Sequence, residues 1–452
     1  MTQASKLGRS LGLWSVLALA SCSSEDGLNP PMGEGGSVGV AGAAQSGAGQ
    51  PASGGTSAGT SAQAGANNQA GANNQAGANN QAGANNQAGN AGAAQGGSAA
   101  GGPGQDCASA PADPCPMPTG ITIGCSKRFA LGINYAWRNF GADFGGLAAW
   151  SIQGVSAAPA GYAADLAAMK AAGASVIRWW VFPDFRSDGV QFDGNDDPTG
   201  LSAVALADMA KALELAQAAN VYLVPTIFSF DAFRPKHTTE NVTVRSMAPL
   251  VKAPARRAKL VANVVTPLAK AAAASPHRAR LLGWDLINEP EWAIEVSGQN
   301  SQDFTPNEEL TAVSLADMKA LISEMMAVLE AQTPAAFTSV GWAAAKWSWA
   351  FTDLALDVNQ PHIYGWVNQY WPYTRKPAEL GYPTTRPTIM GEFFLESMPF
   401  SDSNANDTFA TIMESWWKNG YAGAWPWQHF EDAANLPLIK TFADAKGCQV
   451  KP

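Results

Sequence analysis

The sequence has few charged residues and few histidines, and each shortage excludes a class of protein. Only 14% of its 452 residues are charged and the formal net charge is −9, so the composition gives no support for a nucleic-acid partner. The four histidines do not stand at metal-ligand spacing, and the chain has neither a Cys-x-x-Cys pair nor a His-Glu-x-x-His segment. Because these are the common signatures of zinc sites, we expect neither a metal ion nor another cofactor.

Large apolar residues are almost absent from residues 22–105, which consist mainly of Gly, Ala, Ser, Asn and Gln. Such a segment cannot bury enough surface to offset its chain entropy. Within it, the unit Gly65-Ala-Asn-Asn-Gln-Ala70 repeats in tandem up to Ala88, with a period too short for a solenoid. We expect a disordered low-complexity linker, which leaves residues 106–452 for one folded domain.

The first 21 residues have the pattern of an export signal. Lys6 and Arg9 precede an apolar run from Leu11 to Ala20, which is too short to span a bilayer. The segment Leu19-Ala-Ser-Cys22 that ends this run resembles a bacterial lipobox. We therefore expect residues 1–21 to be a lipoprotein signal peptide and Cys22 to carry the lipid anchor. This resemblance implies attachment to the outer membrane or cell surface, and simple secretion is the alternative.

Four further cysteines are present: Cys107, Cys115, Cys125 and Cys448. An even number in an exported chain favours disulfides over metal binding. Three pairings are possible. We favour Cys107 with Cys115 and Cys125 with Cys448, because the second bond would join the two ends of the folded domain.

Short apolar runs alternate with amphipathic helical stretches from about residue 126 onward, a pattern typical of parallel βα units. Eight such runs predict an α/β fold of the (β/α)8 TIM barrel type. An open doubly wound sheet is the alternative, but no glycine-rich phosphate turn follows the first run. The expected strands are 129–136, 175–182, 221–228, 281–288, 336–342, 356–364, 387–393 and 421–427.

Two of these strands, the fourth and the seventh, run into a glutamate. Glu289 follows Leu281 to Asn288, and Glu392 follows Pro387 to Gly391. Barrel enzymes place their chemistry at the C-terminal ends of the strands, and hydrolysis of a glycosidic bond requires two carboxyl groups flanking that bond. Together the two glutamates indicate a glycosidase, although either one alone is equally explained as a polar strand-end residue.

The motifs around these glutamates resemble glycoside hydrolase family 5, in clan A of the retaining glycosidases, over essentially the whole barrel. The resemblance rests on five features in the right order at the right strand ends, each of them weak alone. They are Arg178 in Val-Ile-Arg-Trp-Trp, Asn288-Glu289-Pro290, His362-Ile-Tyr364, Gly391-Glu392-Phe393 and a tryptophan near the end of strand eight.

This resemblance implies a role for each polar residue. Glu289 would be the general acid/base and Glu392 the nucleophile, with Arg178 lowering the pKa of Glu392; a structural ion pair is the alternative role for Arg178. The other three matching residues would act around the carboxylates. Asn288 would bind the 2-hydroxyl of the sugar, Tyr364 would donate to Glu392, and His362 would contact the acid/base or a sugar hydroxyl, unless it is only a packing residue.

Sixteen tryptophans supply aromatic rings for the apolar faces of sugars. We expect Trp427 beneath the reacting sugar and Trp425 on the same face of the strand, with Trp137, Trp180 and Trp292 as further sugar contacts. One feature departs from the family pattern. Many members carry a histidine at the end of strand three, where this chain has Ser229, with His237 farther along the loop.

The sequence therefore predicts a retaining endo-β-glycosidase that hydrolyses a β-1,4-linked polysaccharide. The resemblance favours β-mannan or glucomannan, with cellulose or β-glucan next. The alternative is a catalytically silent barrel that serves as a surface glycan-binding lipoprotein. We expect a monomer whose partner is the polysaccharide or oligosaccharide substrate and which meets the membrane only through its N-terminal anchor.

Overall fold

The structure is a computed structural model that describes residues 112–295, 304, 306–365, 367, 371–394, 407–429 and 435–452. All of them belong to the second of the two units of the chain, Gly89–Pro452. The expected signal peptide, the expected linker, Cys22 and Cys107 lie outside the described residues. The boundaries expected at residues 21/22 and 105/106 therefore stay predictions.

Eight parallel strands form one closed ring. Seven pairings join them in the order β14-β13-β10-β7-β4-β3-β16-β15. Parallel bridges Asn359↔Thr388 and His362↔Glu392 join the two ends of this order, so the sheet closes into the (β/α)8 barrel that the sequence predicts. The strands are β3 (Ala130–Asn134), β4 (Val176–Trp180), β7 (Tyr222–Ser229), β10 (Gly283–Asn288), β13 (Phe337–Trp342), β14 (Gln360–Pro361), β15 (Ile389–Met390) and β16 (Gly423–Ala424).

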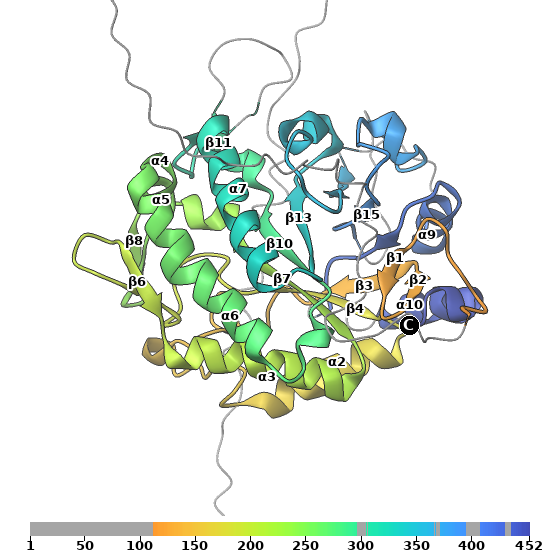
Figure 1. Ribbon diagram of the computed structural model, residues 1–452, viewed down its shortest axis with the longest axis horizontal. Coiled ribbons are helices and arrows are strands. Elements are labelled where there is room, and N and C mark those ends of the chain that lie inside the picture. Colours follow the sequence, from red (N-terminus) through yellow and green to blue (C-terminus); the bar gives the residue numbers. More distant parts are fainter. Residues whose placement is uncertain are drawn as a thin grey trace, which may run out of the picture. The chain divides into compact units, whose positions relative to one another are not determined.

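Helices surround the strands, and α2, α3, α6 and α7 contact one another in succession around them (Figure 1). Local capping starts two of the long helices: the side chains of Ser202 and Ser314 accept hydrogen bonds from Ala205 N and Asp317 N, a contact worth about 1 kcal/mol per helix. The helices are α2 (Pro159–Ala171), α3 (Ala203–Ala219), α4 (Ala248–Lys252), α5 (Pro254–Leu260), the π-helix η4 (Val261–Val265), α6 (Thr266–Ala274), α7 (Leu315–Gln332), α9 (Phe409–Lys418) and α10 (Leu436–Lys446).

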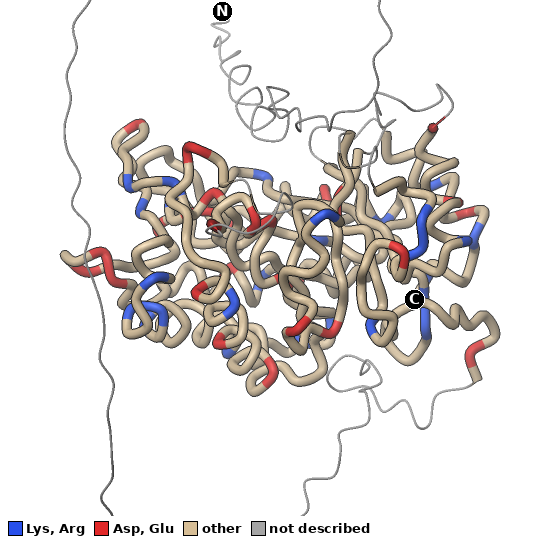
Figure 2. Tube along the Cα trace, turned by 90° about the horizontal axis from the view of Figure 1, so that it is seen from above, with Lys and Arg blue, Asp and Glu red and all other residues tan. Residues whose placement is uncertain are grey.

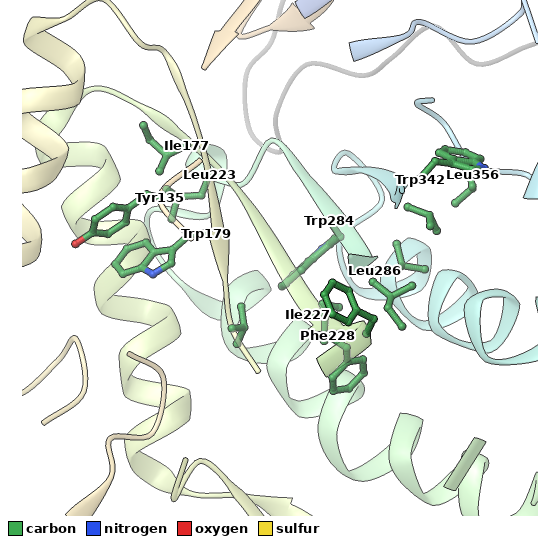
Figure 3. Close-up of a cluster of buried hydrophobic side chains, with 14 of the residues drawn as sticks. Tyr135, Ile177, Trp179, Leu223, Ile227, Phe228, Trp284, Leu286, Trp342 and Leu356 are labelled. Atoms are coloured by element: carbon green, nitrogen blue, oxygen red, sulfur yellow. The ribbon is translucent and has the colours of Figure 1, made fainter. Parts of the chain in front are cut away.

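Two hydrophobic clusters lie on the two sides of the barrel wall. Strand residues alternate between the clusters, because successive side chains of a strand point to opposite faces. In β4, Ile177 and Trp179 pack outward with the helices (Figure 3), whereas Val176 belongs to the inner cluster. The same alternation turns Arg178 inward, toward the axis of the barrel.

The hairpin of β1 (Ile121–Ile123) and β2 (Ser126–Arg128) contributes Ile121 and Ile123 to the inner cluster. Its partners there include Val176 and Tyr222, which begin β4 and β7. The hairpin therefore packs at the N-terminal end of the barrel and leaves the C-terminal ends of the strands for a site.

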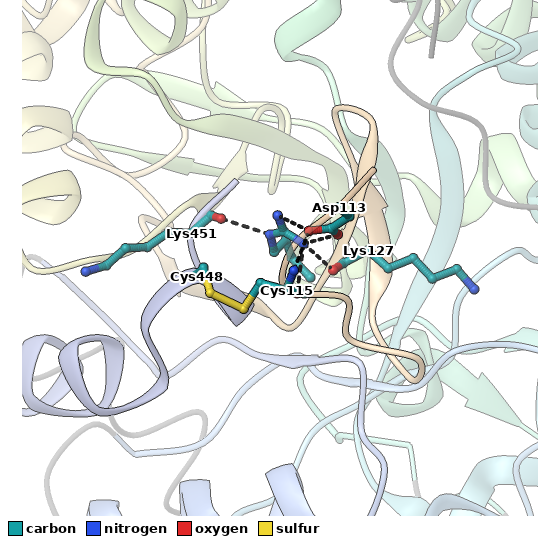
Figure 4. The surroundings of a disulfide bond; sticks show 6 residues. Asp113, Cys115, Lys127, Cys448 and Lys451 are labelled. Carbon is teal, nitrogen blue, oxygen red and sulfur yellow. Dashed lines mark hydrogen bonds and ion pairs between the residues drawn. A yellow bond between two sulfur atoms is a disulfide. The ribbon is translucent and has the colours of Figure 1, made fainter. Parts of the chain in front are cut away.

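The disulfide pattern corrects one expectation. Cys115 is bonded to Cys448, with Cα atoms 6.0 Å apart (Figure 4). This bond contradicts both pairings that we favoured, Cys125 with Cys448 and Cys107 with Cys115. Arg128 lies beside this bond, and its Nε donates to the carbonyl of Lys451 at 2.9 Å. Cys125 follows Gly124 in the tight turn of the β1–β2 hairpin and is also disulfide-bonded. A bond does join the two ends of the domain, but through Cys115.

Acidic and basic residues are interspersed along the described chain (Figure 2). Among the helices that the structure describes, none is both long and apolar enough to cross a bilayer. Two antiparallel hairpins extend from the C-terminal side of the barrel, one after β4 and one after β7. They are β5 (Val190–Phe192) with β6 (Pro198–Leu201) and β8 (His237–Thr239) with β9 (Val242–Val244).

Candidate active site

Glu289 and Glu392 meet at the C-terminal end of the barrel. Glu289 directly follows β10 and Glu392 follows β15 by one residue, and the two are 4% and 2% exposed. One oxygen of each carboxyl group and one ring nitrogen of His362 all lie within 4.8 Å of one another. Retaining glycosidases hold their two carboxyl groups about 5 to 5.5 Å apart, whereas inverting enzymes need about 6.5 Å or more. Oxygens no more than 4.8 Å apart favour the closer, retaining arrangement.

His362 lies between the two carboxyl groups. Its Nδ1 is 2.7 Å from Oε1 of Glu289 and 3.5 Å from Oε2 of Glu392. Burial lowers the pKa of His362 to about 4, even though the nearby charge of Glu392 opposes the decrease. The ring is therefore neutral at neutral pH and acts as a hydrogen-bonding group.

Arg178 supplies the positive charge of the site. It is fully buried on the inner face of β4, and its Nη1 donates to Glu392 Oε1 at 2.5 Å and to Asn134 Oδ1 at 2.8 Å. Its Nη2 donates to Asn288 Oδ1 at 2.8 Å. Each of these contacts fixes the guanidinium against a different strand, so the charge cannot move away from Glu392.

Asp285 on β10 completes the support of Arg178, and the sequence analysis missed it. One carboxylate oxygen of Asp285 accepts from Arg178 Nε at 2.9 Å and Nη2 at 2.6 Å, and from the hydroxyl of Thr226 at 3.1 Å. A carboxylate inside an apolar strand was the available signal, because a buried charge requires a partner. Asn134 was also missed, and its short polar side chain in β3 gave no comparable signal.

Each carboxyl group also accepts a hydrogen bond from an aromatic side chain. The hydroxyl of Tyr364 donates to Glu392 Oε2 at 3.0 Å, as the resemblance implied. Trp292 on the short helix η6 (Pro290–Ala293) donates its Nε1 proton to Glu289 Oε2 at 2.8 Å. Trp292 was expected as a sugar contact, and here it also holds the carboxyl group of Glu289 in place.

The surroundings separate the two carboxyl groups in acidity. Burial raises the pKa of Glu289 to about 7, although the Trp292 hydrogen bond and the charge of Arg178 oppose this increase. Burial also raises the pKa of Glu392, against the opposing effects of His362 and Arg178. Because Arg178 bonds directly to Glu392 and not to Glu289, Glu392 is the one that ionises first. Glu289 is then the one that keeps its proton.

The backbone of Glu289 has a left-handed conformation, with φ 47° and ψ 50°. A non-glycine residue in this region costs about 1 kcal/mol or more, and such residues cluster at functional sites. The N–H of Glu289 donates to the carbonyl of Gly341 on β13 at 2.8 Å, which helps to hold this conformation. The turn directs the side chain across the barrel mouth toward His362.

Three of the expected tryptophans form one group beside the carboxyl groups. The Trp427 ring lies 5.8 Å from Trp137 and 5.5 Å from Trp180, and Trp137 lies 5.3 Å from Trp180. The guanidinium of Arg178 is 5.8 Å from the Trp180 ring, which fixes this group next to the charged centre. Trp427 and Trp137 are half-buried, so their rings are partly open to a ligand.

The structure corrects the expectation that Trp425 contacts the sugar, because this residue does not reach the site. It is fully buried in the inner cluster and donates its Nε1 proton to the carbonyl of Ala130 at 3.0 Å. Trp425 and Trp427 do share a face of the strand, as expected. The inner face of a barrel strand, however, passes through the core before it reaches the mouth, and Trp425 lies on the core side.

The end of strand three carries no histidine. The hydroxyl of Ser229 donates to Asp231 Oδ2 at 2.9 Å, and His237 lies on β8 with its Nδ1 2.9 Å from the carbonyl of Pro235. His237 therefore does not replace the histidine that many family 5 members have here. Asp231, which the sequence analysis did not single out, has its pKa raised to about 6 by burial and by the nearby Asp184.

Glu289, His362 and Glu392 have donor atoms close enough to hold a metal ion. These three side chains are better suited to acid–base chemistry than to metal binding, because the Arg178 guanidinium already lies 2.5 Å from Glu392. A cation bound between the three groups would sit beside this fixed positive charge. The arrangement fits a site in which one carboxyl group donates a proton and the other one attacks.

No protein-family model matches the sequence. The chain is similar to a mannan endo-1,4-β-mannosidase of Mytilus edulis, with 23% identity over 343 residues, which are 69% of this chain and 86% of the relative. It is similar to the enzyme of the same name from Cryptopygus antarcticus, with 24% identity over 336 residues, 68% of this chain and 81% of the relative.

Solved structures with a similar fold include two mannanases. The β-1,4-mannanase of the sea hare Aplysia kurodai superposes with a TM-score of 0.58 at 19% identity, covering 72% of this chain and 95% of that one. The β-mannanase of the mussel Mytilus edulis superposes with a TM-score of 0.57 at 20% identity, covering 73% and 96%. At these identities the similarity shows that the chains share the (β/α)8 fold.

Proposed function

We propose that the protein is a retaining endo-β-glycosidase of the glycoside hydrolase family 5 type that hydrolyses β-1,4-linked mannan or glucomannan. The observation that carries this proposal is the pair Glu289 and Glu392, whose oxygens lie within 4.8 Å in two different environments. A protein that only binds glycans has no need for two convergent carboxyl groups, one of them held beside a buried arginine. The catalytically silent alternative is therefore disfavoured.

In the first step, Glu392 attacks the anomeric carbon of the sugar while Glu289 gives its proton to the leaving glycosidic oxygen. The C–O bond to the leaving sugar breaks and an ester bond to Glu392 forms. Arg178 and Tyr364, which donate to the two oxygens of Glu392 at 2.5 and 3.0 Å, aim the carboxylate and stabilise its charge before the attack.

In the second step, water hydrolyses the ester bond. Glu289, now ionised, takes a proton from the water, whose oxygen attacks the anomeric carbon and displaces Glu392. Two inversions leave the product with the configuration of the substrate. His362, 2.7 Å from Glu289, and Trp292 keep the carboxyl group of Glu289 in place for both proton transfers.

Asn288 and Trp427 position the sugar. The Oδ1 of Asn288 is held by Arg178 at 2.8 Å, which turns its amide nitrogen into the group that donates to the 2-hydroxyl. Trp427 provides an apolar surface for the C–H face of the ring, and the rings of Trp137 and Trp180 contact it at 5.8 and 5.5 Å.

The choice of mannan draws on the names of the relatives, mannan endo-1,4-β-mannosidase in both cases. Cellulose or another β-glucan is the second candidate, from the wider resemblance to family 5. Initial rates of the purified protein on β-mannan, glucomannan, carboxymethylcellulose and xylan test the proposal. We expect mannan or glucomannan to be the fastest, and activity on none of the four would contradict it.

The cellular setting is part of the proposal. The segment Leu19-Ala-Ser-Cys22 and the low-complexity residues 22–105 support an exported protein that is tethered by a lipid on Cys22. Labelling of cells with a radioactive fatty acid tests the anchor. We expect incorporation into the wild-type chain and none into Cys22→Ala.

A further inference from the structure

A second concave region lies outside the carboxylate site, among the loops that follow β4 and β7. It is a pocket of about 600 Å³, within the size range of sites that bind small molecules. Strand β5 forms one wall and the β8–β9 hairpin forms another. Its exposed uncharged polar lining consists of Gln191, Thr199, Asn241 and Thr243.

The charge of this pocket favours a neutral ligand. Both of its arginines are already paired, Arg186 with Asp184 at 2.7 Å and Arg245 with Asp196 at 3.0 Å. The lining also includes the carboxylate of Asp188. Phosphate or another anion would meet no unneutralised positive charge here, whereas amide and hydroxyl side chains suit the hydroxyl groups of a sugar.

A continuous row of contacts leads from the carboxylate site to the pocket. Trp427 contacts Trp137 at 5.8 Å, and Trp137 contacts Phe140 at 4.7 Å, edge to face. The guanidinium of Arg186, which lines the pocket, then lies 4.2 Å from the Phe140 ring. The row places the pocket only a few side chains away from Trp427, within reach of an extended polysaccharide bound over that ring.

We propose that this pocket is a distal binding site for the same polysaccharide, in which Gln191 and Thr243 hydrogen-bond sugar units remote from the bond that is cleaved. The inference rests on the proposed function. Such a site acts only on chains long enough to reach it, so it increases the efficiency of the enzyme on polymers and leaves short substrates unaffected.

Two kinds of variant in the full-length chain test the proposal. Gln191→Ala combined with Thr243→Ala removes the two hydrogen-bonding groups, and Ala149→Trp fills the pocket from its exposed rim. Thr238→Ala is the matched control on the same hairpin, and Gly194→Trp is the control for the added ring, because a side chain there meets no atom within 4 Å. Neither control position lines the pocket.

The measurement compares kcat/KM on the best polymer with kcat/KM on a chromogenic disaccharide glycoside of the same sugar. We expect both pocket variants to lose about tenfold on the polymer, the size of two lost hydrogen bonds, and to match the wild type on the short substrate. Equal losses on both substrates, or no loss on the polymer, would overturn the proposed distal binding site and leave the proposed function standing. A wild-type chain that hydrolyses no polysaccharide would overturn the proposed function together with it.

Discussion

Arg178 and Asp285 are joined inside the barrel by two hydrogen bonds, from Nε at 2.9 Å and Nη2 at 2.6 Å to a single carboxylate oxygen. Both side chains are fully buried. This pair fixes the guanidinium in the orientation that its Nη1 needs to reach Glu392. The charge of Asp285 also compensates part of the charge that Arg178 presents to Glu392.

Asp285→Asn is expected to lower the free energy of unfolding by about 3 kcal/mol, because it breaks a buried ion pair. The less compensated Arg178 then favours the ionised form of Glu392, so the pKa of Glu392 falls and the acid limb of the pH–kcat/KM profile moves to lower pH. Thermal unfolding and the pH profile measure the two effects. Glu214→Ala, at the exposed Lys211–Glu214 pair, is the control and should change neither.

The pKa of about 7 for Glu289 predicts the basic limb of the pH profile. Activity requires protonated Glu289, so it declines as the pH rises through about 7. Trp292→Phe removes a hydrogen bond that stabilises the ionised carboxylate. The pKa of Glu289 therefore rises and the basic limb moves to higher pH. A basic limb that stays in place in this variant would show that Glu289 is not the proton donor.

Glu289 and Glu392 are expected to differ from Glu291, a third buried carboxyl group nearby. Burial raises the pKa of Glu291 well above its usual value, and its Oε2 accepts from the N–H of Ala343 at 3.2 Å. Glu289→Gln and Glu392→Ala should each lower kcat by at least about a thousandfold. Glu291→Gln keeps an oxygen that can accept from Ala343 N and should retain most activity.

Azide separates the two roles of the catalytic pair. In Glu392→Ala, azide enters the space of the lost nucleophile and attacks a substrate with an activated leaving group directly, which gives a glycosyl azide of inverted configuration. In Glu289→Ala, azide attacks the ester on Glu392 and gives a glycosyl azide of retained configuration. Retained configuration from Glu392→Ala together with inverted configuration from Glu289→Ala would show that the two roles are exchanged.

Truncation of Trp425 is expected to affect mainly stability, whereas truncation of Trp427 is expected to affect mainly substrate binding. Trp425→Ala leaves a cavity inside the barrel and should lower the free energy of unfolding by about 3 to 5 kcal/mol. Trp427→Ala removes a half-buried ring at the mouth and should mainly raise KM, with a smaller change in stability. Chemical unfolding and steady-state kinetics on both variants make the comparison, and a stability loss as large in Trp427→Ala would place that ring in the core.

Removal of metal ions is expected to have no effect. The donor atoms of Glu289, His362 and Glu392 lie within 4.8 Å of one another, but Arg178 provides the positive charge at Glu392. Dialysis against EDTA should leave kcat/KM unchanged. A loss of activity that Zn²⁺ or Mn²⁺ restores would show that the three groups hold a metal.

The strands and the two glutamates could be predicted from the sequence for one physical reason. Parallel strands buried on both faces are continuous apolar runs, so their ends are visible, and Glu289 and Glu392 stand at two such ends. The family resemblance added Arg178, His362 and Tyr364, which the structure places within hydrogen-bonding distance of the pair. What these residues do in catalysis remains a prediction.

Features that depend on tertiary packing could not be predicted in the same way. Trp425 and Trp427 share one strand face, and only the position of each residue along the barrel axis decides whether it lies in the core or at the site. The partner of Cys448 depends on where helix α10 and the β1–β2 hairpin meet. The pocket lined by Gln191 and Thr243 lies between two hairpins whose loops carry no periodic pattern.

The configuration of the first product tests the central claim most directly. The close pair of Glu289 and Glu392 predicts two successive inversions at the anomeric carbon. Proton NMR during hydrolysis of a β-linked mannan oligosaccharide should show the β anomer first, followed by slow mutarotation to the α anomer. Initial appearance of the α anomer would contradict the account, because a single displacement by water does not use Glu392 as a nucleophile.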